Sequence, residues 1–272
     1  MSVDFEPGQI MRFREKVFTF YHDNRRQFPW RETRNRYEIL VSEMMLQQTQ
    51  AERVVEKYLE WLERFPDVAS LAAASLKEVL SCWSGLGYNA RGQRLHRCAR
   101  IITDAYASTV PASPEVLITL PGIGVYSSRS IPVFADNLDI AAVDTNIRRV
   151  FIHELGLPET VRRRELSELA EKVLPRGQSR DWHNALMDYG ALELTGKKTG
   201  IRPVSRQSVF KGSRRWYRGK IIRDLVAAEG MALEEFTERY GEQVAGVLDE
   251  LEDEGLVERC ASPGVTCYRI PD

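Results

Sequence analysis

The segment Leu120–Tyr126 reads Leu-Pro-Gly-Ile-Gly-Val-Tyr and forms a predicted glycine hairpin between two helical stretches. Gly122 and Gly124 flank one apolar residue, so the backbone can turn sharply and leave amide groups uncovered where a helix opens near Val125. Uncovered amides at a helix N-terminus suit an anion such as a phosphate. A plain connection between two helices is the alternative interpretation of the hairpin.

Length and composition limit the possible classes of protein. A length of 272 residues predicts two units at about 150 residues each, and 43% hydrophobic residues suffice for real cores. Apolar runs such as Ile39–Val41 are far shorter than the roughly 18 residues of a membrane span. The first residues lack a basic region followed by an apolar core, so we expect a cytoplasmic protein, nucleoid-associated in a prokaryote, with reduced thiols.

Charge is segregated along the chain, although the net charge is only −1. Residues 196–223 carry ten Lys and Arg and no acid, interleaved with Phe210, Trp216 and Tyr217, whereas residues 224–259 carry twelve acids and two arginines. The basic stretch suits a polyanion and the acidic stretch would repel one. A solvated linker followed by an acidic surface is the alternative.

Most of the chain has helical periodicity, capping signatures and few alternating β-branched runs, which predicts an all-α class with a small β appendage. Helices are expected at residues 8–22, 50–64, 125–134, 162–174 and 181–194, and Pro132 distorts the last turn of the helix at 125–134. Further helices are expected to begin at about 37, near 68, at 75, at 113 and at 144, and a basic helix carries Arg91 to Arg100.

Glu43 lies inside an almost wholly apolar helix that is predicted to be buried. An ionised carboxylate is costly to bury, so Glu43 either faces a wet pocket or has a raised pKa. Thr49 and Glu52 fit a capping box for the next helix, which places Gln47 and Gln48 in the turn between the two helices. Two glutamines at an exposed turn can contact base edges, and ordinary turn polarity is the alternative.

The last part of the chain changes character. Helices at 216–228, 233–240 and 243–254 precede two strands, 256–260 and 265–270, an order that predicts a winged helix. A turn centred on Pro263 and Gly264 would place Cys260 opposite Cys267 on one face of the hairpin. In the cytoplasm we expect this pair to stay as two thiols.

Six motifs in order resemble the helix-hairpin-helix DNA glycosylases, most closely the MutY-type adenine DNA glycosylases. They are Phe-Pro-Trp-Arg (28–31), Ser-Glu-Met-Met-Leu-Gln-Gln-Thr (42–49), Gly-Leu-Gly-Tyr (85–88), Leu-Pro-Gly-Ile-Gly (120–124), Val-Asp-Thr-Asn (143–146) and Leu-Met-Asp-Tyr-Gly-Ala (186–191). The resemblance implies a two-lobed helix-hairpin-helix fold with a small winged-helix-like (α+β) appendage. It also implies an enzyme that binds duplex DNA, flips a base out of the stack and hydrolyses its glycosidic bond.

Glu43 and Asp144 fit the chemistry of that reaction. Cleaving a glycosidic bond builds an oxocarbenium-like sugar and a poor leaving group, so one acid must protonate the base and one carboxylate must stabilise the cation. Apolar surroundings would keep Glu43 protonated near neutral pH, whereas backbone amides at a helix start would hold Asp144 ionised. A plain helix cap is the alternative role for Asp144.

The resemblance assigns further residues. Tyr126 and Asn146 would orient the sugar and the carboxylates, and Gln48 would wedge into the base stack beside the flipped base. Bifunctional relatives have a lysine at position 126, so tyrosine there predicts a monofunctional glycosylase that leaves an abasic site. The expected DNA contacts come from Gln47, Gln48, Thr49, Leu86, Tyr88, Gly122, Gly124, Val125, Arg214, Arg215 and Arg218.

The chain departs from the MutY pattern in two places. MutY-type enzymes usually have four cysteines after the Met-Asp-x-Gly-Ala helix, but here residues 193–198 read Glu-Leu-Thr-Gly-Lys-Lys. We therefore expect no iron–sulfur cluster, at most a monovalent cation at the hairpin, and a basic block that replaces the cluster loop. The tail is also too short for the domain with which many MutY enzymes read 8-oxoguanine.

The expected division has one lobe of residues 1–28 plus 135–200 that carries Asp144. A six-helix lobe of residues 29–134 holds the hairpin, followed by a basic linker at 201–223 and a winged-helix-like tail at 216–272. We expect a monomer whose DNA substrate has a mismatched adenine opposite guanine or 8-oxoguanine, with the acidic tail open to a protein partner. The alternatives are a thymine or uracil mismatch glycosylase, and a catalytically silent binder of damaged DNA.

Overall fold

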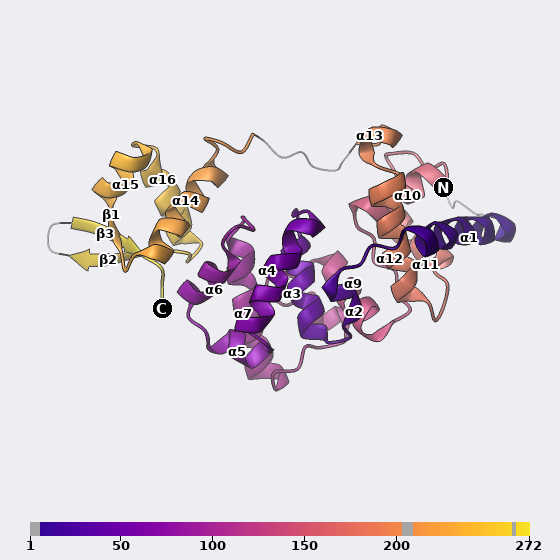
Figure 1. The fold of residues 1–272 in the computed structure, drawn as a ribbon, viewed down its shortest axis with the longest axis horizontal. Coiled ribbons are helices and arrows are strands. Elements are labelled where there is room, and N and C mark those ends of the chain that lie inside the picture. Colours follow the sequence, from indigo (N-terminus) through magenta and orange to yellow (C-terminus); the bar gives the residue numbers. More distant parts are fainter. Residues whose placement is uncertain (1–5, 203–208, 263–264) are drawn as a thin grey trace. The chain divides into compact units, whose positions relative to one another are not determined.

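The computed structural model describes residues 6–202, 209–262 and 265–272. The predicted all-α class with a small β appendage is confirmed. Of the helices in these three stretches, none combines the length and the apolar character that crossing a membrane requires. The elements are α1 (Pro7–Asn24), α2 (Pro29–Glu32), α3 (Arg36–Leu46), α4 (Ala51–Arg64), α5 (Val68–Ala73), α6 (Leu76–Trp83), α7 (Ala90–Tyr106), α8 (Pro114–Leu117), α9 (Val125–Asp136), α10 (Thr145–Glu154), α11 (Arg163–Val173), α12 (Ser179–Asp188), the π-helix η1 (Tyr189–Glu193), α13 (Gly196–Thr199), α14 (Arg214–Ala227), β1 (Met231–Ala232), α15 (Leu233–Tyr240), α16 (Val244–Asp253), β2 (Glu258–Ser262) and β3 (Val265–Arg269) (Figure 1).

The chain divides into two compact units. The first contains Met1–Glu43, Ala112–Thr119 and Ile123–Arg206, and the second contains Met44–Pro111, Leu120–Gly122 and Gln207–Asp272. These packing units cut the chain at places other than the predicted lobe boundaries, and the division into lobes stays a prediction. Residues 203–208 of the predicted basic linker lie outside the described residues.

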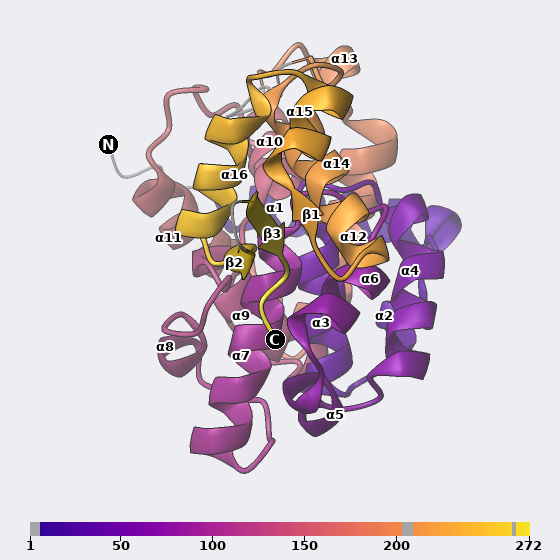
Figure 2. The same ribbon diagram turned by 90° about the vertical axis from the view of Figure 1, so that its left-hand side faces the viewer.

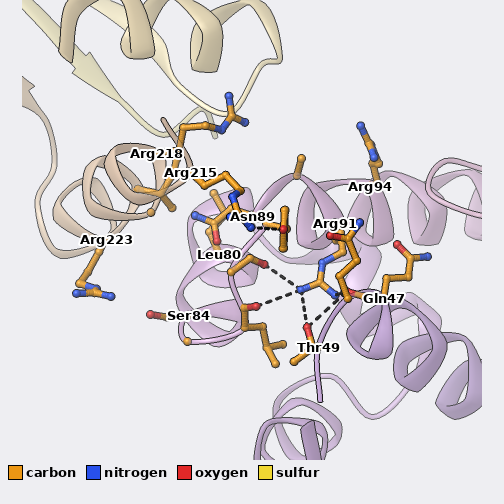
Figure 3. A pocket seen from close by; sticks show the side chains of 18 of the residues that line it. Gln47, Thr49, Leu80, Ser84, Asn89, Arg91, Arg94, Arg215, Arg218 and Arg223 are labelled. Carbon is orange, nitrogen blue, oxygen red and sulfur yellow. Dashed lines mark hydrogen bonds between the residues drawn. The ribbon is translucent and has the colours of Figure 1, made fainter. Parts of the chain in front are cut away.

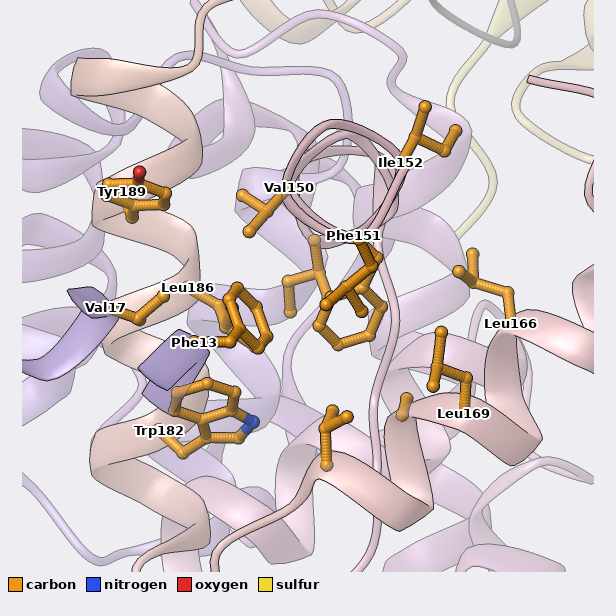
Figure 4. Packing of buried hydrophobic residues seen from close by; sticks show 14 of the residues in the cluster. Phe13, Val17, Val150, Phe151, Ile152, Leu166, Leu169, Trp182, Leu186 and Tyr189 are labelled. Carbon is orange, nitrogen blue, oxygen red and sulfur yellow. The ribbon is translucent and has the colours of Figure 1, made fainter. Parts of the chain in front are cut away.

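The first unit is built around a core of large side chains from α1, α10, α11 and α12 (Figure 4). Phe13 of α1 makes edge contacts with Phe151 and Trp182, with ring centroids 5.9 and 5.5 Å apart. Such aromatic pairs stabilise beyond the area they bury, by about 0.5–1.5 kcal/mol each. This packing fixes α10, whose first turn carries Asp144 and Asn146.

The second unit joins α4–α7 to the C-terminal tail. Trp61 packs edge-on against Phe65 and Trp83, at 5.0 and 5.6 Å between centroids. Leu76 and Leu80 of α6 belong to the same buried cluster as Ile221 and Leu225 of α14. The tail therefore shares a hydrophobic core with α6.

The tail has the predicted three helices and hairpin, with one strand more. β3 lies between β1 and β2 in an antiparallel sheet beside α14, α15 and α16 (Figure 2). β1 escaped the sequence prediction because it has two residues, too few for an alternating pattern. Pro263 and Gly264, at the predicted turn, lie outside the described residues.

Cys260 and Cys267 pair across the hairpin as the pattern predicts, but their predicted thiol state is wrong. The structure joins them by a disulfide. Their Cα atoms lie 5.2 Å apart, within the range that a disulfide spans. The register of β2 and β3 brings the two sulfur atoms together, whereas the prediction of free thiols was based on the expected cytoplasmic location.

Two local predictions need correction. The N-cap of α4 is Gln50 without a side-chain cap, because the Thr49 hydroxyl accepts a hydrogen bond from Arg91 instead. Helix α9 continues through Pro132 to Asp136. Ser75, Ser113 and Asp144 cap the helices that follow them, which begin where the sequence predicts.

Candidate active site

Glu43 is buried in α3, with 7% of its surface exposed. The Ser130 hydroxyl donates a hydrogen bond of 2.5 Å to Glu43 Oε2. Burial, with a smaller contribution from the Asp144 charge, raises the pKa of Glu43 to about 7, against the opposing effect of the Ser130 and Tyr126 hydrogen bonds. Near neutral pH a large fraction of the Glu43 side chain therefore carries its proton, as the apolar helix predicts.

Tyr126 and Ser130 stand one turn apart on α9, on the face toward Glu43. The Tyr126 phenol is buried, and Glu43, Asp144 and Ser130 all influence its pKa. Burial, then the charges of Glu43 and Asp144, raise the pKa of Tyr126 well above its usual value, so the phenol stays neutral. Ser130 escaped the sequence interpretation, although its i+4 spacing from Tyr126 was a usable signal.

Asp144 is the N-cap of α10, and its Oδ1 accepts a hydrogen bond of 2.7 Å from the Ile147 amide. Asn146 Nδ2 donates to Asp144 Oδ2 at 3.1 Å. Burial nevertheless raises the pKa of Asp144, against the opposing effect of these hydrogen bonds and of the Arg149 charge. The backbone amides lower the pKa of Asp144 as predicted, and desolvation outweighs them without showing which form is present at neutral pH.

Arg149 connects this cap to the π-helix η1. Its Nη2 donates to Asn146 Oδ1 and to the Gly190 carbonyl, both at 2.7 Å, and its Nε donates to the Leu194 carbonyl. Asn146 is thereby held with its Nδ2 toward Asp144. The sequence analysis did not single out Arg149.

The site thus places two carboxyl groups of raised pKa, a neutral phenol and a serine hydroxyl within one compact unit. Titratable groups with shifted pKa values that face one another are typical of acid–base catalysis. A protonated Glu43 can donate a proton, and an ionised Asp144 can stabilise a positive charge.

The hairpin needs its first glycine. Gly122 has φ +83°, and a Cβ there would come within 2.5 Å of Met44 Cε and 3.1 Å of Arg94 Cβ. Gly124 is the N-cap of α9, and a Cβ there would meet nothing within 4 Å. Val125, the next residue, is 53% exposed, so the start of α9 lies at the surface.

The turn after α3 separates the two glutamines. Gln47 Nε2 donates to the Gly122 carbonyl at 3.2 Å, so its amide is used in holding the hairpin. Gln48 is exposed and has φ 58°. The turn at 85–88 presents Tyr88, which is 37% exposed, whereas Leu86 is buried.

Arg91, which the sequence placed only on a basic helix, joins these two turns from inside (Figure 3). Its guanidinium donates to the carbonyls of Met44, Met45 and Gln47, and to those of Leu86 and Gly87. Its Cζ atom lies 5.2 Å from the centroid of the Trp83 ring. Burial lowers the pKa of Arg91 to about 10.

Two of the three predicted tail arginines are engaged with α16. Arg214 forms an ion pair with Glu250 at 2.7 Å, and Arg218 forms one with Glu254 at 2.6 Å. Arg215 instead lies over the ring of Tyr88, 5.4 Å from its centroid, and donates to the Tyr88 hydroxyl.

The residues after η1 do not fit a four-thiolate cluster. Thr195 caps the short helix α13, which carries Lys197 and Lys198 where thiolates would be needed. The cysteines lie in α6, in α7 and in the β2–β3 disulfide. Within residues 6–202, 209–262 and 265–272, no group of three or more His, Cys, Asp and Glu could hold a metal ion.

Comparison with known proteins identifies the family of the chain. Residues 41–176, which include Glu43, Tyr126 and Asp144, match the HhH-GPD superfamily of base excision DNA repair proteins. The chain is 35% identical to the adenine DNA glycosylase of Mycolicibacterium smegmatis over 228 residues, which cover 76% of this chain and 78% of that protein. It is 32% identical to the human adenine DNA glycosylase over 204 residues, which cover 70% of this chain and 37% of that protein.

Among solved structures, a thermostable thymine-DNA glycosylase superposes with a TM-score of 0.65 at 29% identity. The match covers 71% of this chain and 90% of that one. Sequence match, relatives and fold point to the same group of proteins, and the chain therefore belongs to the HhH-GPD superfamily of base excision DNA repair proteins.

Proposed function

We propose that this protein is a monofunctional adenine DNA glycosylase that removes adenine mispaired with guanine or 8-oxoguanine. The observation that carries the proposal is Glu43, a buried acid of pKa about 7 that faces Tyr126 and the charge of Asp144. The adenine DNA glycosylases at 35% and 32% identity support adenine as the excised base.

The residues divide the proposed reaction between them. Glu43 gives its proton to a ring nitrogen of the flipped adenine while the bond from the sugar carbon to the base breaks and its electron pair leaves with the base. Asp144 stabilises the positive charge that develops on the sugar. Water then attacks the sugar carbon and loses a proton to a carboxylate, which leaves free adenine and an abasic site.

The pH dependence follows from the two carboxyl groups. The rate of single-turnover excision should fall by about tenfold per pH unit above pH 7, because Glu43 must carry its proton to act as the acid. At low pH the rate should fall again as Asp144, whose pKa is also raised, gains a proton. A rate that keeps rising from pH 7 to pH 9 would contradict Glu43 as the acid.

The proposed chemistry is hydrolytic because α9 has tyrosine, not lysine, at position 126 and contains no lysine. Treating the reacting enzyme with borohydride should therefore give no covalent protein–DNA product. Excised strands should break only after alkali. An efficient borohydride adduct would show an amine nucleophile and refute the hydrolysis-only mechanism.

The base specificity is tested with labelled duplexes that carry adenine, thymine or uracil opposite guanine, and adenine opposite 8-oxoguanine. We expect abasic sites at adenine. Release of thymine or uracil alone would favour the alternative that the thymine-DNA glycosylase structure suggests. Tight binding with no release from any duplex would make the protein a silent binder of damaged DNA.

We infer that duplex DNA is bound as substrate, with the hairpin amides at Gly124 and Val125 on the phosphate backbone. A monovalent cation at the hairpin is part of this proposal. The absence of a cluster is likewise a proposal, supported by lysines at the position where thiolates would be required.

A further inference from the structure

Ser130 is a buried hydroxyl group beside Glu43 to which the proposed reaction assigns no part. It lies on α9, and its side chain has no exposed surface. Its hydroxyl donates to Glu43 Oε2 at 2.5 Å, across 87 positions of the chain. Both residues belong to the first compact unit. The contact is therefore built by the packing of that unit, and it reaches the group proposed as the acid.

The hydroxyl of Ser130 is not used in the way that is usual for a serine inside a helix. Such a serine commonly donates its proton to a backbone carbonyl of the preceding turn. Ser128 does so, toward the Val125 carbonyl at 3.0 Å. For Ser130 the equivalent acceptor, the Ser127 carbonyl, lies at 3.4 Å, longer than the roughly 2.7–2.8 Å of a typical hydroxyl hydrogen bond. Because a serine hydroxyl has one proton, the shorter contact identifies Glu43 as its acceptor.

This hydrogen bond makes the two oxygen atoms of the Glu43 carboxyl group unequal. A neutral carboxyl group has one oxygen that carries the proton and one carbonyl oxygen that accepts hydrogen bonds. While Oε2 accepts the proton of Ser130, the acidic proton of neutral Glu43 is on Oε1. A proton on Oε2 would face the Ser130 oxygen, and the proton of Ser130 would have to turn to the more distant Ser127 carbonyl.

Two ionisable groups also act on Glu43. They are Tyr126, on the same helix as Ser130, and Asp144, at the start of α10. The Asp144 charge raises the pKa of Glu43, whereas the hydrogen bond from Ser130 lowers it because a donated hydrogen bond stabilises the carboxylate. Ser130 therefore opposes the effect of Asp144 and makes Glu43 a stronger acid than burial alone would leave it.

We propose that Ser130 is a positioning residue for base excision, which holds Oε2 of Glu43 and thereby keeps the transferable proton on Oε1. The proposal rests on the proposed function, in which Glu43 protonates the flipped adenine. The proton passes from Oε1 to a ring nitrogen while the bond from the sugar carbon to the base breaks and its electron pair leaves with the base. Ser130 keeps its own proton throughout, and its hydrogen bond stabilises the carboxylate that remains.

Ser130→Ala tests this role in the reaction. Without the donor, the acidic proton can occupy either oxygen, and the carboxylate loses a stabilising hydrogen bond. The single-turnover excision rate at pH 6 should fall by about three- to tenfold, and the decline at high pH should begin about one pH unit later than in wild type. Affinity for the duplex should stay unchanged, because Ser130 has no exposed surface.

Ser128→Ala is the matched control. Ser128 is also buried and lies on the same helix, but its hydroxyl donates to the carbonyl of Val125 within α9. Its loss should change neither the rate at pH 6 nor the pH at which the decline begins. The same pH profile for both variants would overturn the proposal, because the loss of a hydroxyl group from the helix would then account for both results.

A titration of Glu43 in the free protein separates this proposal from the proposed function. NMR of glutamate labelled at its carboxyl carbon reports the protonation of Glu43, whose signal is identified by its absence in Glu43→Gln. The midpoint of the titration should move up by about one pH unit in Ser130→Ala and stay unchanged in Ser128→Ala.

An unchanged midpoint in Ser130→Ala would refute the proposal even if the wild-type protein removes adenine. A raised midpoint together with an unchanged pH profile of excision would also refute it, because the hydrogen bond would then have no part in proton transfer. If the midpoint rises but the wild-type protein removes no adenine, the proposed function is wrong, and the contact between Ser130 and Glu43 stands as a property of the fold.

Discussion

Glu43→Gln should lower the single-turnover rate of adenine excision by about 10²- to 10⁴-fold, the usual contribution of a general acid. The amide keeps the size of the side chain and can still accept the Ser130 hydrogen bond, but it has no acidic proton to give. Measured at saturating enzyme with a labelled mismatch duplex, the loss should appear in the rate and not in the affinity.

The same substitution should lower activity but raise stability relative to wild type as pH rises. This difference distinguishes the loss of the acid from damage to the fold. Because the folded protein raises the pKa of Glu43 from 4.5 to about 7, the wild type loses stability as pH rises through this window. Glutamine has no such dependence, so the melting temperature of the variant relative to wild type should rise between pH 5 and pH 8. Glu38→Gln, on the same helix, should leave excision unchanged.

A near-normal excision rate for Glu43→Gln would mean that another residue is the general acid. Tyr126 is a poor substitute, because its pKa lies well above the usual value and its phenol gives up a proton reluctantly. The pH profile distinguishes these cases, since loss of the Glu43 carboxyl should also abolish the decline above pH 7.

Local signals in the sequence were enough to single out the two candidate catalytic carboxyl groups. Apolar neighbours mark Glu43 as a buried acid, and the start of a helix marks Asp144 as a cap. The structure places both residues as expected. The glycine hairpin likewise depends on residues adjacent in the chain. Local periodicity and capping therefore account for most of the helices as well.

Residues that act across the fold had no such signal. Arg91 belongs by pattern to a basic helix, yet it is buried because four hydrogen-bond acceptors from the end of α3 and the turn after it, more than 40 residues away, converge on it with two from the adjacent turn at 85–88. The pairing of the acids of α16 with α14 is equally long-range. Charge segregation along the sequence suggested repulsion from DNA, and the three-dimensional pairing changes that inference.

The carboxylate of Asp144 is the second group on which the proposed reaction depends. Asp144→Asn should reduce excision by at least about 10²- to 10³-fold, the usual effect of removing one group that stabilises developing charge. The amide oxygen can still accept the Ile147 hydrogen bond, so α10 should keep its cap and duplex binding should survive. Excision and binding are measured on the same protein, by single-turnover kinetics and by equilibrium titration.

Asp67→Asn is a matched control for a plain helix-capping role. Asp67 caps α5 with a hydrogen bond of 2.7 Å from the Ser70 amide, the same distance that joins Asp144 to Ile147. If capping were the whole function of Asp144, the two substitutions would change the free energy of unfolding by similar amounts and would have equal effects on the excision rate. If Asp144 stabilises the sugar cation, only Asp144→Asn loses excision, and the loss persists at temperatures where both variants are fully folded.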